Sequence, residues 1–420
     1  MSTHGARVRG HLPSAYWRQF AASLVSNLGD GANYAAMPLL AVTVTNDVRL
    51  IAATTFASML PWLLLSLPAG VYIDRWDRKK VMVTTNSIRA VLYGVLAVLV
   101  ATRSLGIWVL LLLLLLIGCA EVFFDMSAQA FLPSIVPEEQ LHRANGLLYA
   151  AEVVCNSFIG LPVGAWLFVV AAGVPFGVNG ASFAIAAALV ASIRGNTVPS
   201  NDNPASPRAG FVTELREGMS WLWAHRNIRT LAILLGVTNG ALMFGASIFV
   251  KFAFRYLGVG PRGYGILLAL NSAGAIVGGL LGDRIARRIG VSASVIGAYV
   301  VFALADAVQA TFPTIAVVAA MSISVSLAGT LWNIVTVSYR QRVIPADLFG
   351  RVNSAYRFIG TGSIALGALI GGQVAHSFGL RAPFYLGSTV TVIALLWGLP
   401  VLRSAEFADV GGATDQSSRD

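Results

Sequence analysis

The chain has 420 residues, of which 56% are hydrophobic and 11% are charged, and its formal net charge is +10. Soluble domains carry roughly 25% charged residues, so this composition excludes an ordinary soluble protein. The apolar residues recur in blocks long enough to cross a hydrocarbon layer as helices, which takes about 20 residues at about 1.5 Å each. No alternation with a period of two runs through the blocks, which argues against an outer-membrane barrel.

The blocks predict twelve membrane-spanning helices, so the expected fold class is an all-α integral membrane protein. The residues before the first helix lack the short apolar core and cleavage site of a removable signal peptide, so none is expected. In chain order, the predicted spans are 19–43, 50–72, 81–102, 106–130, 144–171, 174–193, 230–254, 263–282, 291–311, 314–338, 352–376 and 381–402.

Positive charge is distributed unevenly between these helices. With the N-terminus placed inside, 21 of the 29 Lys and Arg residues fall on cytoplasmic segments, five on outer loops and three within helices. This bias follows the positive-inside rule and predicts a multi-pass protein of the plasma or inner membrane with both termini in the cytoplasm. The basic charge is thus explained by topology, and no nucleic-acid partner is expected.

Similar segments recur at a nearly constant distance along the chain. GVYIDRWDRKK follows the second predicted helix and GLLGDRIARRIG follows the eighth, with Asp74 aligned to Asp283 at an offset of 209. The same offset pairs Asp30 with Asn239, and IVPEEQLHRANGLL aligns with VIPADLFGRVNSAY at an offset of 208. We therefore predict two six-helix halves in the same orientation, a parallel repeat about an axis along the membrane normal.

The hydrophobic pattern is interrupted once, between the sixth and seventh helices. RGNTVPSNDNPASPRAG is rich in Pro, Asn and Ser and is typical of a flexible linker, and an amphipathic segment follows it. The end of the chain is polar and is predicted to be disordered. The expected organisation is an N-terminal bundle (1–193), a cytoplasmic linker with an amphipathic helix (194–229), a C-terminal bundle (230–403) and a cytoplasmic tail (404–420).

The two repeated loops combine glycine, aspartate and basic residues. In lipid, glycine lets helices approach closely, and aspartate can accept hydrogen bonds from a neighbouring helix start. The basic residues can pair with carboxylates of the other half or with lipid phosphates. The residues that make up this pattern are Gly70, Asp74, Arg75, Arg78, Lys79, Asp283, Arg284 and Arg287.

These loops resemble the signature of the major facilitator superfamily, and the resemblance covers almost the entire chain. SNLGDGANYAAMPLLA, FLPSIVPEEQLHRANGL and YRQRVIPADLFGRVNSAYR look like the branch that includes the enterobactin-type siderophore exporter and macrolide efflux proteins. The resemblance implies two parallel-related six-helix bundles. It also implies that the eight loop residues are gating residues, which form a cytoplasmic latch that breaks when the inner gate opens. The alternative is that the loop charges only set the topology.

The fifth helix carries the sequence GLPVG, with Gly160, Pro162 and Gly164. It resembles the Gly-Pro signature of superfamily antiporters and drug exporters, although it has fewer glycines than the full pattern. Proline frees a backbone carbonyl and kinks a helix, and the glycines permit tight packing. The motif favours export, and the alternative is a packing seam alone.

Ionisable residues inside the predicted helices point most directly to function, because a carboxylate at mid-bilayer costs at least ~2.5–3.5 kcal/mol on insertion scales. Asp30 lies near the middle of the first helix, and Glu121 and Asp125 share one face of the fourth. In the superfamily that the chain resembles, helices 1, 4, 5, 7, 10 and 11 line the central path. The candidate proton and substrate pathway is therefore Asp30, Glu121, Asp125, Glu152, Asn239, Lys251 and Arg357.

Each of these residues also has a purely structural interpretation. Asp30 would fix helix packing by a hydrogen bond, Glu121 and Asp125 would pair with Arg89 or Arg143, and the two basic residues would only neutralise the acids. Four aromatic residues are candidates for a substrate-stacking surface, with ordinary packing as the alternative. They are Tyr34, Phe244, Trp332 and Tyr356.

The sequence excludes several sources of energy and chemistry. No GxxxxGK[ST] loop occurs, no His/Cys cluster offers a metal site, and no Ser-His-Asp arrangement stands out. We therefore expect a transporter and not an enzyme, with no cofactor and no metal, that draws on an ion gradient.

The first hypothesis is proton antiport with alternating access, with Asp30 as the favoured proton carrier. It would export a small amphipathic molecule, such as a drug, a macrolide-like natural product or a siderophore. The expected partners are this substrate, protons and the lipid bilayer, and the expected assembly is a monomer. The alternatives are a proton-coupled or facilitative importer of a small nutrient, and a non-transporting receptor or scaffold.

Overall fold

The computed structural model describes residues 11–73, 76–194, 211–345, 348–405 and 407, and their regular structure is entirely helical. The first half contains α1 (Ser14–Val44), α2 (Val48–Ile73), α3 (Arg78–Ala101) and α4 (Ile107–Ile135). Its fifth crossing is composite, and the sixth is α7 (Val174–Ala191). The composite crossing consists of a 3-10 turn, η1 (Glu138–Gln140), then α5 (Leu141–Glu152), a π-helical stretch, η2 (Val153–Gly160), and α6 (Leu161–Val170).

The second half begins with the amphipathic helix α8 (Phe211–Ala224). Its first crossing is again composite, and five long helices follow. The crossing is α9 (Arg226–Ala246), α10 (Phe249–Phe252) and a π-helical turn, η3 (Ala253–Leu257). The five helices are α11 (Pro261–Ile289), α12 (Val291–Thr311), α13 (Ile315–Val343), α14 (Phe349–Phe378) and α15 (Ala382–Leu402).

Eleven of the described helical segments are long and apolar enough to cross a membrane. The more polar α1, 31 residues long, is the twelfth long segment, so the expected all-α architecture is confirmed. The largest differences from the predicted spans are at helix ends: α11 continues to Ile289, and α4 and α13 continue to Ile135 and Val343. Hydropathy marks only the apolar part of a helix, whereas backbone hydrogen bonding continues the helix into the polar region.

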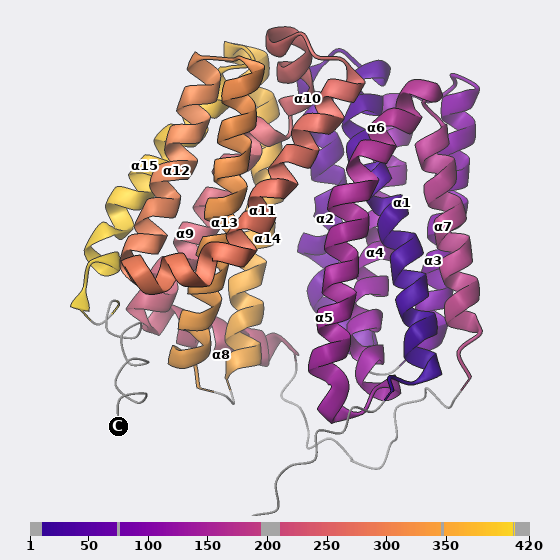
Figure 1. Cartoon of the computed structure of the whole chain (residues 1–420), viewed down its shortest axis with the longest axis horizontal. Coiled ribbons are helices and arrows are strands. Elements are labelled where there is room, and N and C mark those ends of the chain that lie inside the picture. The colour runs from indigo at the N-terminus through magenta and orange to yellow at the C-terminus, as the bar shows by residue number, and fades with distance from the viewer. Residues whose placement is uncertain (1–10, 74–75, 195–210, 346–347, 406, 408–420) are drawn as a thin grey trace, which may run out of the picture.

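The helices form two bundles side by side (Figure 1). In the first, α3 packs against α4 and α7, and α1 packs against α7; in the second, α11 packs against α13, and α9 against α14 and α15. One end of the molecule carries α8 and the start of α1, and we call it the α8 end; the opposite end carries α10 and is called the α10 end.

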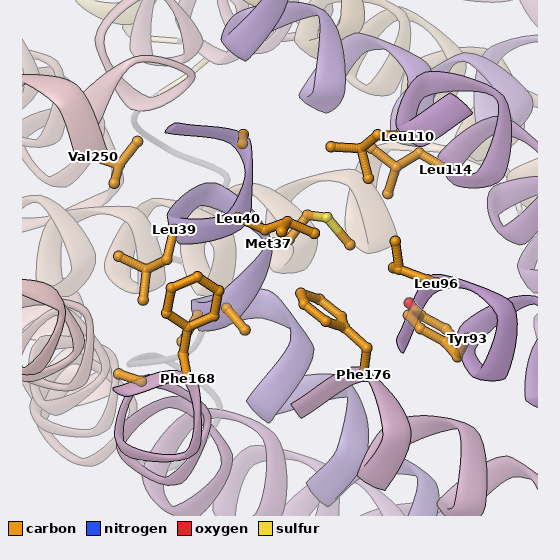
Figure 2. Close-up of a cluster of buried hydrophobic side chains, with 14 of the residues drawn as sticks. Met37, Leu39, Leu40, Tyr93, Leu96, Leu110, Leu114, Phe168, Phe176 and Val250 are labelled. Atoms are coloured by element: carbon orange, nitrogen blue, oxygen red, sulfur yellow. The ribbon is translucent and has the colours of Figure 1, made fainter. Parts of the chain in front are cut away.

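The two bundles meet mainly along α2 with α14 and along α6 with α11. Close approaches at these seams include Gly372 against Ala52 and Gly265 against Ala165. A buried apolar cluster near the α10 end includes Val250 of α10 beside residues of the first bundle (Figure 2). The halves are thus joined towards the α10 end, whereas the bundles diverge towards the α8 end (Figure 1).

The predicted linker and tail both contain ordered structure. α8 packs on α14, where Arg351 donates to Glu217 across 2.9 Å. Within the segment predicted to be a disordered tail, Phe407 is fully buried and its ring lies 4.6 Å from that of Tyr339. Residues 406 and 408–420 lie outside the described residues. The sequence contained no sign of this contact, because a single aromatic residue in a polar segment forms no periodic hydrophobic pattern. In the structure, Phe407 nevertheless packs in the core of the second bundle.

Phe407→Ala should destabilise the second bundle, because it removes a fully buried aromatic side chain and leaves a cavity. We expect a loss of about 3 kcal/mol in unfolding free energy, measured as a lower melting temperature of the purified protein. The matched control is Phe378→Ala, since Phe378 is 79% exposed. Equal melting temperatures for the two variants would contradict the anchoring role of Phe407.

Candidate functional site

An ion-pair cluster around a buried arginine lies inside the first bundle, where α1, α3, α4 and α7 meet. The Arg89 Nη2 atom on α3 lies 3.3 Å from the Asp30 Oδ1 atom on α1 and 4.0 Å from the Glu121 Oε2 atom on α4. Asn179 on α7 donates from Nδ2 to the same Asp30 oxygen across 3.5 Å. The Arg89 side chain is only 4% exposed, whereas that of Asp30 is 29% exposed. One guanidinium therefore serves two carboxylates.

Aromatic rings hold the Arg89 guanidinium in place. Its Cζ atom lies 3.7 Å from the centroid of the Phe183 ring and 5.8 Å from that of Phe124. A cation over an aromatic face is attracted by the ring quadrupole, and this attraction strengthens when water is excluded. Rings and carboxylates together thus stabilise the position of Arg89 in this conformation, and the cation that pairs with Asp30 has little access to water.

Two glycines flank Asp30, and each is in close contact with another helix. A Cβ atom on Gly29 would lie 2.3 Å from the Asn179 side chain, and one on Gly31 would lie 2.2 Å from the Asn156 carbonyl oxygen in η2. On the other side of this second seam, a Cβ on Gly164 would lie 2.1 Å from the Ala32 carbonyl oxygen. Asp30 therefore sits on a backbone segment clamped between the sixth and fifth crossings.

The fifth crossing accommodates Pro162 through a π-helical register. Proline has no N–H to donate, and the Leu161 N–H just before it bonds to the Asn156 carbonyl five residues back. The sequence predicted a proline kink in the fifth helix, and the structure places the π-helical stretch η2 immediately ahead of the proline. The glycines of GLPVG form the predicted tight seam, here with α1.

The second bundle repeats the packing without the charge. A Cβ on Gly367 of α14 would lie 2.3 Å from the Gly240 carbonyl oxygen of α9, as Gly164 does against α1. Asn239, the counterpart of Asp30, donates from Nδ2 to the Gly360 carbonyl oxygen across 3.2 Å. The first bundle therefore has an ion-pair cluster at a position where the second has a neutral amide.

The remaining acids extend the cluster towards the α8 end. Asp125 lies one turn beyond Glu121 on α4 and is partly buried, and Glu152 is exposed at the end of α5. Asp125 interacts electrostatically with Arg89 and Glu152, and Glu152 with Asp30. Four of the predicted pathway residues are thus brought together around Arg89. The sequence had indicated only a possible pairing role for Arg89.

Lys251 and Arg357 do not join this cluster. The Lys251 Nζ atom donates to the Asn46 carbonyl oxygen, so it connects α10 to the turn between α1 and α2 at the α10 end. Arg357 is exposed on α14. Hydropathy correctly placed both residues within helices. It could not show which of them would contact the other bundle, because that depends on how the bundles pack. The structure favours a contact between halves as the role of Lys251.

The four candidate aromatics separate into two groups. Tyr34 is 66% exposed and lies within electrostatic range of the Tyr264 hydroxyl on α11 of the other bundle. Phe244, Trp332 and Tyr356 are buried. Tyr356 stacks under Arg340 and donates to the Leu231 carbonyl, so it packs within the second bundle. In this conformation only Tyr34 of the four presents its ring outside the packed core.

The candidate gating residues find partners within their own halves. Arg78 donates to the Ala130 carbonyl across 3.0 Å and Lys79 to the Ile193 carbonyl across 2.6 Å. Asp283 pairs with Arg287 one turn along α11, next to Arg284. Gly70 lies within α2, and Asp74 and Arg75 lie outside the described residues. The latch between halves remains a prediction.

Asp47 forms a charged cluster at the α10 end, in the turn between α1 and α2. Its carboxylate accepts two bonds from the Arg49 guanidinium, at 3.1 and 2.7 Å, and lies 4.0 Å from His376 of the other half. The hydrogen bond with the Arg49 side chain is the main reason that the pKa of Asp47 falls from 3.8 to about 2. Asp47 is therefore charged at any physiological pH.

Asp47→Asn should lower the melting temperature by the same amount at pH 5 and pH 8. Because the folded-state pKa is depressed, the stabilisation by Asp47 is complete above about pH 4 and is lost only as the pH falls towards 2. The pH profile of transport should be unchanged, because this carboxylate does not titrate in the working range. A profile shifted between pH 5 and 8 would contradict this assignment.

Comparison with known proteins places this geometry in a family. A family model described as "Transmembrane secretion effector" matches residues 13–414. The chain is similar to the multidrug efflux pump Tap of Mycobacterium tuberculosis, with 26% identity over 403 residues, 92% of this chain and 94% of that protein. It is also similar to macrolide efflux protein A of Streptococcus pyogenes, with 24% identity over 359 residues, 83% of this chain and 86% of that protein.

The fold is shared with a solved bacterial homologue of the iron transporter ferroportin. Its inward-facing structure gives a TM-score of 0.72 at 14% identity, covering 95% of this chain and 100% of that chain. Its outward-facing structure gives a TM-score of 0.58 at 17% identity, covering 92% of this chain and 98% of that chain. The arrangement of the two bundles is thus more similar to the inward-facing structure.

Proposed function

The chain belongs to the transmembrane secretion effector family, and from this membership we propose that it exports a small amphipathic molecule by proton antiport with alternating access. The observation that carries the proposal is the cluster of Asp30 and Glu121 around buried Arg89, at a position where the second bundle has the neutral Asn239. A carboxylate that shares one desolvated cation with another carboxylate is a site where a proton can replace an ion pair.

Alternating access is supported by the way the halves meet. Their close contacts lie towards the α10 end, and Lys251 donates across the halves there. The positive-inside bias assigns the α8 end to the cytoplasm. With this orientation, the seams support a state closed to the outside, in which Arg78 and Lys79 bond within their own half. Rocking of the bundles would open the α10 end and let the latch form between them.

Proton antiport assigns a cycle to the acid cluster. Asp30 takes a proton from the outside, the bundles rock, and the proton leaves on the cytoplasmic side as substrate moves outwards. At a 100 mV potential, one charge supplies about 2.3 kcal/mol, enough for about a 50-fold gradient of a neutral substrate. Glu121, Asp125 and Glu152 surround this carrier, and exposed Tyr34 offers a stacking surface on the same helix.

The substrate class is proposed from the relatives. Multidrug and macrolide efflux proteins are similar along most of the chain, which favours macrolide-like natural products and lipophilic drugs as cargo. A siderophore remains a second cargo to test. The proposed assembly is a monomer, because the two bundles of one chain provide both halves of the alternating-access unit.

Transport in everted membrane vesicles tests this function. With an acidic lumen, a radiolabelled macrolide or a lipophilic dye should accumulate inside, and a protonophore should abolish the accumulation. Vesicles without the protein provide the control. Accumulation in right-side-out vesicles, driven by an inward proton gradient, would instead establish an importer and overturn the proposed direction.

A further inference from the structure

A fully buried amide without a partner lies one turn from the ion-pair cluster. Asn86 of α3 is 0% exposed, and neither its Oδ1 nor its Nδ2 atom has a hydrogen-bond partner. Buried side-chain amides are almost always paired, because an unpaired one loses its bonds to water without replacement. Asn86 therefore requires a physical explanation.

Arg89 is the group that can reach this amide. The two residues are three apart on the buried face of α3, so they lie one above the other, with Asn86 nearer the α8 end. A guanidinium has five N–H donors, and the Arg89 Nε has no partner in the structure. The unpaired Asn86 carbonyl oxygen is an acceptor. An Arg89 N–H donor without a partner and this acceptor could therefore satisfy each other.

Asp125 lies on the same side of the cluster as Asn86. It follows Glu121 by four residues on α4, and it belongs to the set of charges that act on Arg89. The described residues include no ion pair of Asp125. One turn of helix is about 5.4 Å, which is within the range of motion of a long arginine side chain. An acid and an amide acceptor thus lie next to the present position of the guanidinium.

We propose that Arg89 is a positioning residue with two docking positions, one at Asp30 and Glu121 and a second at Asn86 and Asp125. When the Asp30 carboxylate takes up a proton and becomes a neutral acid, the guanidinium moves to the second position. When it returns, Asp30 releases its proton. Arg89 stays protonated throughout, so the only bond formed or broken is the O–H bond of Asp30. This inference rests on the proposed proton antiport.

Several titratable groups surround Arg89 and influence which of the two positions its guanidinium occupies. They are Asp30 from α1, Tyr93 from α3, and Glu121 and Asp125 from α4, while Glu152 from α5 faces Asp30 and Asp125. Asn179 from α7 contributes a neutral donor to Asp30. Glu121 and Glu152 favour the protonated form of Asp30 by charge repulsion, and Asp125, together with Asn86, favours it by drawing the guanidinium away.

Two substitutions of Asn86 should shift the protonation of Asp30 in opposite directions. Asn86→Leu removes the second acceptor and keeps Arg89 at Asp30, so protonation should require a pH lower by about one unit. Asn86→Asp strengthens the second position, so protonation should occur at a pH higher by about one unit. The readout is the infrared carboxylic-acid band of the purified protein that Asp30→Asn removes.

The control is Thr85→Val, because Thr85 is buried beside Asn86 but its hydroxyl bonds within α3. If Asn86→Leu does not fold, Asp125→Asn should give the same acid shift. Opposite shifts for the two Asn86 variants establish the second position, and no shift or shifts in one direction overturn it. Proton-driven uptake by everted vesicles is measured separately, so failure of antiport is distinguishable from failure of the Arg89 mechanism.

Discussion

Asp30→Asn is expected to abolish proton-driven accumulation of substrate while leaving downhill movement of the same substrate measurable. The amide keeps the shape of the side chain but cannot exchange a proton, so the chain would become a facilitator. A gradient of about 50-fold, which one charge can support at 100 mV, should fall to about onefold. The measurement compares accumulation and counterflow of a labelled macrolide in everted vesicles.

Asp47→Asn is the matched control for this experiment. Asp47 is also a carboxylate paired with an arginine, but it lies in the turn at the α10 end and stays ionised in the working pH range. The control should retain accumulation at normal expression. If Asp30→Asn accumulated substrate like the wild type and with the same pH profile, Asp30 would not be the proton carrier.

The position of charged residues within the hydrophobic segments predicted part of this site, namely its carboxylates. An acid near the middle of a membrane-spanning helix was expected to face either a charged or polar partner or the transport pathway. Asp30 does lie beside Arg89, Glu121 and Asn179. The sequence did not show that α3 supplies the cation. Hydropathy orders helices along the chain, but it carries no information on which faces meet in three dimensions.

The aromatic residues and Lys251 show the same limit. Tyr34 and Tyr356 have similar sequence surroundings of apolar and small residues, yet one is 66% exposed and the other 2%. Lys251 was placed in a helix near the outside, but its bond to Asn46 depends on how closely the second bundle approaches the first. The repeat predicted paired halves, and tertiary packing decided which side chains face the seam.

The glycine seams are the feature in which sequence repeat and structure agree most directly. Gly31 aligns with Gly240 at the offset of 209, and each packs against a glycine of the later helix in its own bundle, Gly160 or Gly367. In both bundles the backbone of a neighbouring helix occupies the space that a Cβ atom would need. The glycines therefore recur in both halves, although the charge at Asp30 does not. The seams hold the repeat together, and the charged cluster makes the halves unequal.

Gly164→Val should therefore disrupt the first bundle as a whole. A Cβ at this position would lie 2.1 Å from the Ala32 carbonyl oxygen, so α1 and α6 would have to separate along the seam beside Asp30. Forcing a larger side chain into a packed interior costs about 1–3 kcal/mol, and here the obstacle is backbone that cannot rotate away. We expect a large loss of folded protein in the membrane and of transport, measured by fluorescence-detected size exclusion.

Gly94→Val is the matched control, because a Cβ on Gly94 meets no atom within 4 Å. Both substitutions place the same branched side chain in a membrane helix, so intrinsic helix propensity is equal and only the seam differs. Gly367→Val should reproduce the defect in the second bundle, where its Cβ would lie 2.3 Å from the Gly240 carbonyl oxygen. Normal folding of Gly164→Val would show that α1 and α6 are not held at backbone contact, and Asp30 would then lack the rigid support that its pairing with Arg89 requires.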